Sequence, residues 1–113
     1  MITPRRGEIW LVDFGEPVGR EQSGRRPAVV VSADALNDSP AGVVMVIPCT
    51  TSHRNLPSHI EIDPEVSGLD ALSYAKCEDL KSVSERRMIA RLGQVGPSTI
   101  FEVGRVLRFL LEL

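Results

Sequence analysis

The hydrophobic pattern of this chain changes its period once, near residue 96, and that change limits the possible folds more than any other feature. Before it, short runs rich in strand-forming residues alternate with turn residues, whereas after it apolar residues recur at helical spacing. Many short strands followed by one terminal helix are typical of a small, strongly bent antiparallel barrel. We therefore predict a mainly β fold with a C-terminal α-helix.

The expected strands differ in how their two faces should be buried. Residues 27–32 are almost all apolar, which predicts a strand buried on both faces. Residues 59–62 alternate, so Ile60 and Ile62 should face the core while His59 and Glu61 face outwards. The predicted strands are 8–14 (with Trp10 in the core), 27–32, 43–47 (ending at Pro48), 59–62, one or two within 69–80 (with Tyr74 and Cys77 in the core), and 89–95.

Turn-forming residues separate these strands. Residues 34–42 should form a turn region with room for one helical turn, and residues 63–68 and 82–87 should be turns. The terminal helix should begin at Pro97, with Gly96 as its N-cap. Its apolar face should contain Ile100, Val103, Leu107, Leu110 and Leu111.

The composition fits one globular domain covering residues 1–113. Of these residues 42% are hydrophobic and 25% are charged, and no apolar run has the length of a membrane span or of a signal peptide. We therefore expect a cytoplasmic protein in which Cys49 and Cys77 are buried thiols rather than zinc ligands. The net charge of −2 argues against a broad nucleic-acid coat, but it does not exclude a local site.

A charged loop that runs into the second strand is the first candidate for such a site. Residues 19–26 contain three arginines, and Pro27 pushes the backbone of Arg26 towards an extended conformation. Arg26 thus sits at the mouth of a rigid element, where a catalytic or phosphate-binding group can be held in place. Taken alone, however, this stretch is better explained as an ordinary solvated loop, because arginines on polar loops are usually solvated.

A second polar cluster, Thr50-Thr51-Ser52, follows the apolar third strand. Together with Gly7-Glu8-Ile9-Trp10, these segments resemble the MazF/PemK family of toxin endoribonucleases from bacterial toxin–antitoxin systems. Each piece is weakly specific, but their order and spacing make a strong signal that spans nearly the whole chain. The matching pieces are residues 6–14, 21–22, 26–32, 48–51 and 80–83.

The resemblance implies a fold, an activity and partners. The fold is an SH3-like barrel with a C-terminal helix, usually paired as a homodimer. The activity is sequence-specific cleavage of single-stranded RNA (mRNA, rRNA or tRNA), with no metal ion or cofactor, which inhibits translation and growth. The ribose 2′-hydroxyl attacks the phosphate and leaves a 2′,3′-cyclic phosphate and a 5′-hydroxyl. The other expected partner is a MazE-like antitoxin with a flexible acidic segment that folds on binding.

Three residues match catalytic positions of the family: Arg26, Thr50 and Glu21. Arg26 should stabilise the charge of the phosphorane, because a guanidinium stays protonated and is a poor base. The competing interpretation is a surface ion pair between Arg26 and Glu21. Thr50 could donate to a phosphate oxygen or only satisfy its own turn, and Thr51 could replace it. Glu21 could accept a proton or remain a solvated carboxylate.

Residues that flank these three could contact RNA. Arg20 stands where the family often has a serine, which can change the substrate contacts. His53 could touch a base or phosphate, or simply be exposed. Arg86 and Arg87 could bind a phosphate or an acidic antitoxin segment, or form a solvated turn. The predicted RNA-binding residues are Arg20, Gln22, Arg25, Ser32, Thr51, Ser52 and His53.

Two other classes of function remain as alternatives. Toxins that poison DNA gyrase share this fold, and the resemblance places a Trp-Gly pair near their C-terminus. This chain ends in residues 109–113, Phe-Leu-Leu-Glu-Leu, without such a pair. A catalytically inactive binding module would fit the acidic net charge, but it would not explain why Arg26, Thr50 and Glu21 all match the family.

Overall fold

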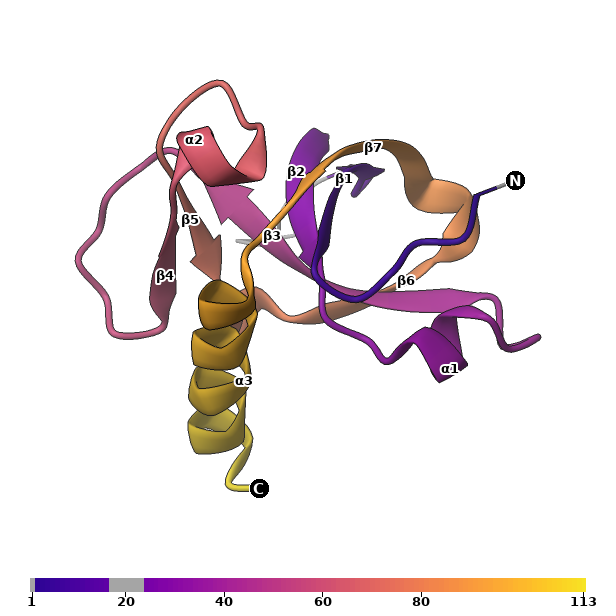
Figure 1. The fold of residues 1–113 in the computed structure, drawn as a ribbon. Coiled ribbons are helices and arrows are strands. Elements are labelled where there is room, and N and C mark those ends of the chain that lie inside the picture. The colour runs from indigo at the N-terminus through magenta and orange to yellow at the C-terminus, as the bar shows by residue number, and fades with distance from the viewer. Residues whose placement is uncertain (1, 17–23) are drawn as a thin grey trace.

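A computed structural model describes residues 2–16 and 24–113 of the chain (Figure 1). In that part of the chain seven strands form one antiparallel sheet in the order β4-β5-β3-β2-β1-β7, with β6 paired to β3. The mainly β, barrel-like architecture with a C-terminal helix is therefore confirmed. The strands are β1 (Glu8–Asp13), β2 (Arg25–Val30), β3 (Val43–Thr50), β4 (His59–Ile62), β5 (Ser73–Lys76), β6 (Lys81–Ser84) and β7 (Met88–Gln94). The helical elements are α1 (Asp34–Asn37), α2 (Pro64–Ser67), the 3-10 turns η1 (Cys77–Asp79) and η2 (Glu85–Arg87), and α3 (Pro97–Leu111).

The central strand, β3, is longer than the sequence indicated. One of its edges pairs with β2, while the other pairs first with β6 and then, at Cys49 and Thr50, with β5. We expected Pro48 to end the strand, but the strand continues through it to Thr50. On the edge of β3 that faces β5 and β6, neither of these strands pairs with Pro48, because the chain between them forms η1 at this point. The N–H that proline lacks is therefore not needed for a strand pair on that edge.

Alternate side chains of the central strands enter two different cores. Because β2 contributes to both, Ala28, Val29 and Val30 are fully buried, as predicted. The core enclosed by β1, β2, β3, β6 and β7 contains Trp10, Val12, Phe14, Ala28, Val30, Val44, Val46, Val83 and Met88. The core beneath α3 contains Ile9, Val29, Ile47, Cys49, Ile62, Ala75, Cys77, Val103 and Val106. Trp10 is thus a core residue, and Tyr74 and Cys77 are buried, in agreement with the sequence.

The terminal helix starts where its signals indicated. Gly96 is the N-cap and Pro97 is the first helical residue. Val103 is fully buried, but Leu110 and Leu111 are 40% and 53% exposed, because the C-terminal end of α3 projects beyond the sheet (Figure 1). The apolar stripe therefore continues past the part of the helix that the sheet covers.

Three local predictions were wrong or incomplete. Of the expected turn 82–87, residues 82–84 belong to strand β6, and only residues 85–87 form a turn, η2. Only Val83 of that strand is buried, so its strand character comes from pairing with β3 and left little trace in the sequence pattern. In β7 two register shifts against β1 break the expected alternation and leave Ile89 and Leu92 exposed. The expected turn at 63–68 contains the single helical turn α2, which Asp63 caps.

His59 is the fourth difference, because its side chain is only 1% exposed although we expected it to face outwards. Its Nε2 atom lies 2.8 Å from Oε2 of Glu78. Ser58 donates a second hydrogen bond to Glu78. Burial raises the pKa of the Glu78 carboxyl, but the hydrogen bonds from His59 and Ser58 outweigh it and the net pKa is lowered. This pair joins β4 to η1.

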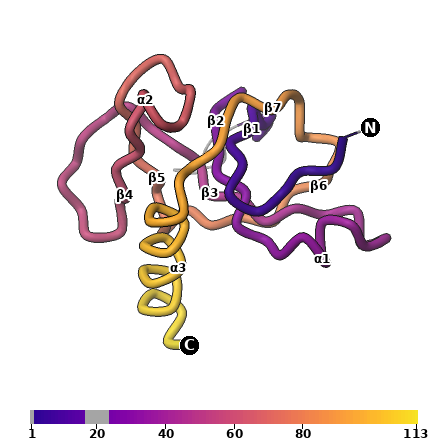
Figure 2. Tube along the Cα trace, in the orientation of Figure 1, coloured from indigo at the N-terminus to yellow at the C-terminus, as the bar shows by residue number. Residues whose placement is uncertain are grey.

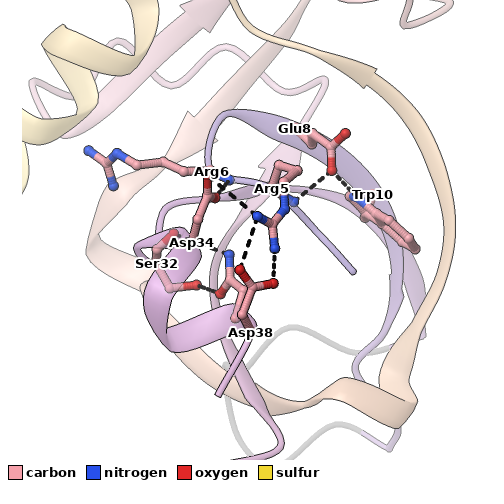
Figure 3. Close-up of polar contacts among 8 residues, drawn as sticks. Arg5, Arg6, Glu8, Trp10, Ser32, Asp34 and Asp38 are labelled. Atoms are coloured by element: carbon pink, nitrogen blue, oxygen red, sulfur yellow. Dashed lines mark hydrogen bonds and ion pairs between the residues drawn. The ribbon is translucent and has the colours of Figure 1, made fainter. Parts of the chain in front are cut away.

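The N-terminal segment runs past α1, as the trace in Figure 2 shows, and is tied to it by polar contacts. Figure 3 shows Arg5 directed at Asp38, with which it forms an ion pair. The carboxylate of Asp34 accepts the backbone N–H of Arg6 at 2.8 Å, and the Arg6 guanidinium donates to the carbonyl of Val31. We call these residues, together with Glu8 and Arg91, the N-terminal network.

Glu8 connects this network to the sheet. Its Oε1 atom accepts the backbone N–H of Arg5 at 2.7 Å and the indole N–H of Trp10 at 3.1 Å, and its Oε2 atom lies 2.6 Å from Nε of Arg91 (Figure 3 shows the first two contacts). Burial alone would raise the pKa of this carboxyl, but the donors outweigh it and the net pKa is lowered. Glu8 is therefore held as a carboxylate.

Candidate active site

Arg26 lies where the inner face of the barrel reaches solvent. On β2 it precedes the buried Ala28 by two residues and therefore shares its face, and the buried Val12 lies opposite it on β1. Arg26 itself is exposed. A strand whose last three residues, Ala28 to Val30, are fully buried thus presents a guanidinium near its exposed start.

The stem of the β1–β2 hairpin fixes the direction in which the chain enters β2. The N–H of Gly24 donates to the carbonyl of Gly15 at 2.8 Å, and the N–H of Phe14 donates to the carbonyl of Gly24 at 2.9 Å. Gly24 has a φ of +69°, a conformation that glycine adopts without steric cost. Two residues later the chain reaches Arg26.

Thr50 ends β3 and is half-buried. It shares the inner face of the strand with Val46 and Pro48. Its Oγ1 atom accepts the backbone N–H of Ser52 at 3.1 Å, which is the turn-satisfying role considered above. That contact uses the oxygen only as an acceptor, so the hydroxyl proton can be donated to another group, such as a phosphate oxygen.

The register of β2 and β3 relates Arg26 to Thr50. The ladder between these strands pairs Ala28 with Pro48 as its last pair towards the mouth; extended by two residues on each strand, the same register would set Arg26 opposite Thr50. Residues directly opposite one another point to the same face of a sheet. Thr50 pairs in turn with Tyr74, and Tyr74 pairs with Glu61. We call this line across β2, β3, β5 and β4 the mouth row: Arg26, Thr50, Tyr74 and Glu61.

An aromatic pair lies on the mouth row. The His53 imidazole stacks on the Tyr74 ring with 4.8 Å between ring centroids and 8° between ring planes. Tyr74 is only 7% exposed, whereas His53 is exposed. The loop that follows Thr50 is thereby held against β5, close to the threonine.

The other predicted residues fall into three groups. Arg25, Thr51 and Ser52 are exposed, Arg25 at the start of β2 and the other two directly after Thr50. Ser32 does not reach this surface: it is 5% exposed, donates to Oδ1 of Asn37 and accepts the N–H of Met45 at 3.1 Å. The predicted residues Arg20, Glu21 and Gln22 lie outside the described residues.

Sequence reasoning did not assign Tyr74 or Arg87 to this region. Tyr74 looked like a core residue, and only the pairing of β3 with β5 shows that it adjoins Thr50. Nη1 of Arg87 donates to the carbonyl of Asp13 at 3.1 Å and lies beside Gly15, at the stem of the hairpin that carries Arg26. The sequence offered Arg86 and Arg87 as ligands of a phosphate or an acidic segment, but it gave no sign of the contact between Arg87 and the hairpin stem.

The cysteines do not contribute reactive groups to this site. Cys49 and Cys77 are both buried thiols, as expected, and burial raises the pKa of each to about 12. Among the described residues, no group of three or more His, Cys, Asp or Glu side chains could hold a metal ion. No helix in the described ranges has both the length and the apolar character needed to cross a membrane.

Comparison with known proteins places this geometry in a family. Residues 5–111 match the family described as PemK-like, MazF-like toxin of type II toxin-antitoxin system. The chain is similar to Endoribonuclease MazF9 of Mycobacterium tuberculosis, with 32% identity over 114 residues that cover 96% of this chain and 97% of the relative. The chain therefore belongs to the PemK/MazF family of toxins.

Solved structures agree with this assignment. Crystalline MazF from Deinococcus radiodurans has a TM-score of 0.89 to this chain, with 24% identity and full coverage of both chains. A MazE–MazF structure from the same organism has a TM-score of 0.84, with 25% identity over 100% of this chain and 99% of the other. The fold is thus that of MazF toxins.

Proposed function

We propose that this chain is the toxin of a type II toxin–antitoxin system and cleaves single-stranded RNA in the cytoplasm without a metal ion. The observation that carries the proposal is the β2–β3 register, which, when extended beyond Ala28 and Pro48, sets Arg26 opposite Thr50 at the mouth of the barrel, in a chain that belongs to the PemK/MazF family. The relative MazF9 is named an endoribonuclease, which favours RNA over DNA gyrase as the target.

The proposed reaction uses the ribose 2′-hydroxyl of the RNA as its nucleophile, with water supplying the proton that the 5′-oxygen gains. The 2′-oxygen attacks phosphorus, the bond to the 5′-oxygen breaks, the 2′-hydroxyl proton passes to a base, and the 5′-oxygen gains a proton. Arg26 supplies a fixed charge and forked donors for the phosphorane. Thr50 donates its hydroxyl to a non-bridging oxygen. Glu21 is the proposed proton acceptor on the family resemblance alone.

Residues around the mouth row would guide the strand to these groups. Arg25, Thr51, Ser52 and His53 are exposed next to Arg26 and Thr50, and we assign them to RNA binding. Arg20 and Gln22 are assigned to the same role from the resemblance. Unpaired RNA suits such a surface, because its bases are free to leave the stack and contact the protein.

The test is cleavage of a long single-stranded transcript by purified protein in excess chelator. We expect fragments with 5′-hydroxyl and 2′,3′-cyclic phosphate ends, and mapping the 5′-hydroxyl ends would give the recognised sequence. A requirement for added magnesium would contradict the mechanism. Supercoiled DNA with gyrase is the second arm, in which trapped cleavage complexes without RNA cutting would favour the gyrase poison.

We also propose that a MazE-like antitoxin inhibits the chain by covering Arg25 and Arg26 with an acidic segment. The solved MazE–MazF structure from D. radiodurans supports a partner of this class. Such a segment would compete with RNA phosphate for the same positive charge. Co-expression of the cognate antitoxin should restore growth, and its acidic segment should displace RNA. An antitoxin that binds together with RNA and leaves cleavage unchanged would contradict this model.

A homodimer is the remaining part of the proposal, and α3 supports it. Phe101 and Phe109 are 70% and 80% exposed on this helix, and Leu113 is 79% exposed just after it. A groove of about 580 Å³ runs beside the same helix. A second copy of the chain would remove this apolar surface from water. Light scattering should give twice the monomer mass, and Phe101→Glu should shift the mass towards the monomer.

A further inference from the structure

Next to Thr50, the mouth row carries a flat aromatic surface that the proposed reaction does not use. The rings of His53 and Tyr74 are within 8° of parallel, with centroids 4.8 Å apart. Tyr74 is almost completely buried, so the accessible ring of the pair is His53. His53 lies in a loop, and its contact with a buried ring of β5 holds the imidazole in one orientation.

We infer that the His53–Tyr74 stack is a nucleobase subsite, which receives a base adjacent to the scissile phosphate. The inference rests on the proposed function and adds a ligand to it. Thr50 and Tyr74 are directly opposed on β3 and β5, so their Cβ atoms lie about 5 Å apart. A phosphate bound to the Thr50 hydroxyl would thus bring a neighbouring base within reach of the stack.

The charges along the mouth row favour the same orientation of the RNA, with its phosphate near Thr50 and a base on the stack. Arg26 and Thr50 occupy one side of Tyr74, and Glu61 pairs with Tyr74 from the other side. A carboxylate repels phosphate, so the sugar–phosphate backbone should follow the Arg26 side while a base turns towards the rings. Stacking on a protein ring is open to every base, because each base has a π face.

The test combines protein and RNA variants in one thermodynamic cycle. After the cleavage site is mapped, two RNAs are made in which an abasic ribose replaces the base on either side of the scissile bond. For the parent protein one of these changes should lower kcat/KM roughly tenfold, a typical effect for one base stacked on a protein ring. His53→Ala should cause the same loss with intact RNA and no further loss with that abasic RNA. His53→Phe should retain most of the activity and of the sensitivity to the missing base.

Two controls separate stacking from charge and from folding. Arg54→Ala alters the neighbouring exposed residue, and any loss it causes should be equal for intact and abasic RNA. Melting temperatures and the Kd for an RNA with a 2′-deoxyribose at the scissile position should show that His53→Ala is folded and loses binding. If the loss of kcat/KM caused by His53→Ala and the loss caused by the abasic RNA are independent, so that the two multiply when combined, the subsite is wrong. The proposed RNA cleavage would still stand in that case. A parent protein that does not cleave RNA would overturn both proposals.

Discussion

The chain uses arginine in two different ways, and the N-terminal network and the mouth row show the contrast. In the network, Arg5 pairs with Asp38, and Nε of Arg91 lies 2.6 Å from the Glu8 carboxylate. At the mouth, Arg25 and Arg26 are exposed at the start of a strand whose last three residues are buried. An arginine-rich composition therefore does not locate a phosphate site, whereas placement on a rigid element beside a hydroxyl does.

The two regions also lie at opposite ends of β2, since Arg25 and Arg26 begin this strand and Val31 follows its end. The network contacts fasten chain segments that are far apart in sequence, so damage there should appear as lost stability. In the mouth row, the side chains of Arg26 and Thr50 lie on strands that are held in place by other contacts. Substitutions there should therefore lower catalysis rather than stability. Four predictions test this division.

The largest expected effect is that of Arg26→Ala on cleavage. We expect kcat to fall roughly 1,000-fold or more, because a charged donor to the phosphorane is removed. The melting temperature should stay near that of the parent, since Arg26 is exposed. Arg5→Ala is the matched variant, which should melt earlier and keep the parental kcat. If Arg26→Ala cleaves at the parental rate, the site assignment fails.

Thr50→Val should have the next largest effect, because it removes the hydroxyl and preserves the side-chain shape. The barrier should rise by about 3 kcal/mol, which corresponds to roughly 100-fold in kcat. Thr50→Ser should recover most of the rate. Thr51→Val should change kcat little, and the opposite ranking of the two valine variants in single-turnover assays would assign the functional hydroxyl to Thr51.

Glu8→Ala should lower stability by about 2 kcal/mol, because the indole N–H of the buried Trp10 loses its acceptor. The pKa of Glu8 is lowered in the folded state from an ordinary value of 4.5. Its contribution is therefore complete above pH 4.5 and is lost as the pH falls through the lowered pKa. Urea melts between pH 7 and 3 should show a weaker acid dependence in Glu8→Gln, with the remaining slope partly due to Glu78. An unchanged slope would contradict the role of Glu8.

Arg87→Ala should have the smallest effect. It removes the 3.1 Å contact with the Asp13 carbonyl at the hairpin stem. We expect kcat/KM to fall roughly threefold, as befits an exposed hydrogen bond worth under about 1 kcal/mol. Arg86→Ala, at the neighbouring position in η2, is the control and should have no comparable effect. Equal losses that disappear at high salt would instead indicate that both arginines attract RNA by charge.

Much of the architecture could be predicted because its signals are local. Pro97 and Gly96 mark the start of α3, the apolar run from Ala28 to Val31 specifies a strand buried on both faces, and Pro27 sets the extended backbone of Arg26. These features depend on steric limits of the residues themselves and on the period of side-chain burial. The placement of Arg26 at the start of a rigid strand could be predicted for the same reason, whereas the catalytic roles of Arg26 and Thr50 were inferred from the family resemblance.

The sequence by itself thus determined the order of the elements and the residues offered to the site. Only the tertiary structure decided that β3 continues through Pro48, that Thr50 meets Tyr74, and that the side chain of His59 is buried. Each of these depends on a partner segment distant in the chain, and local periodicity carries no information about which segment that is. The mouth row therefore depends on the register of the strands. Burial of the two cores selects this register, because a slip by one residue would exchange the two faces of β2 and β3.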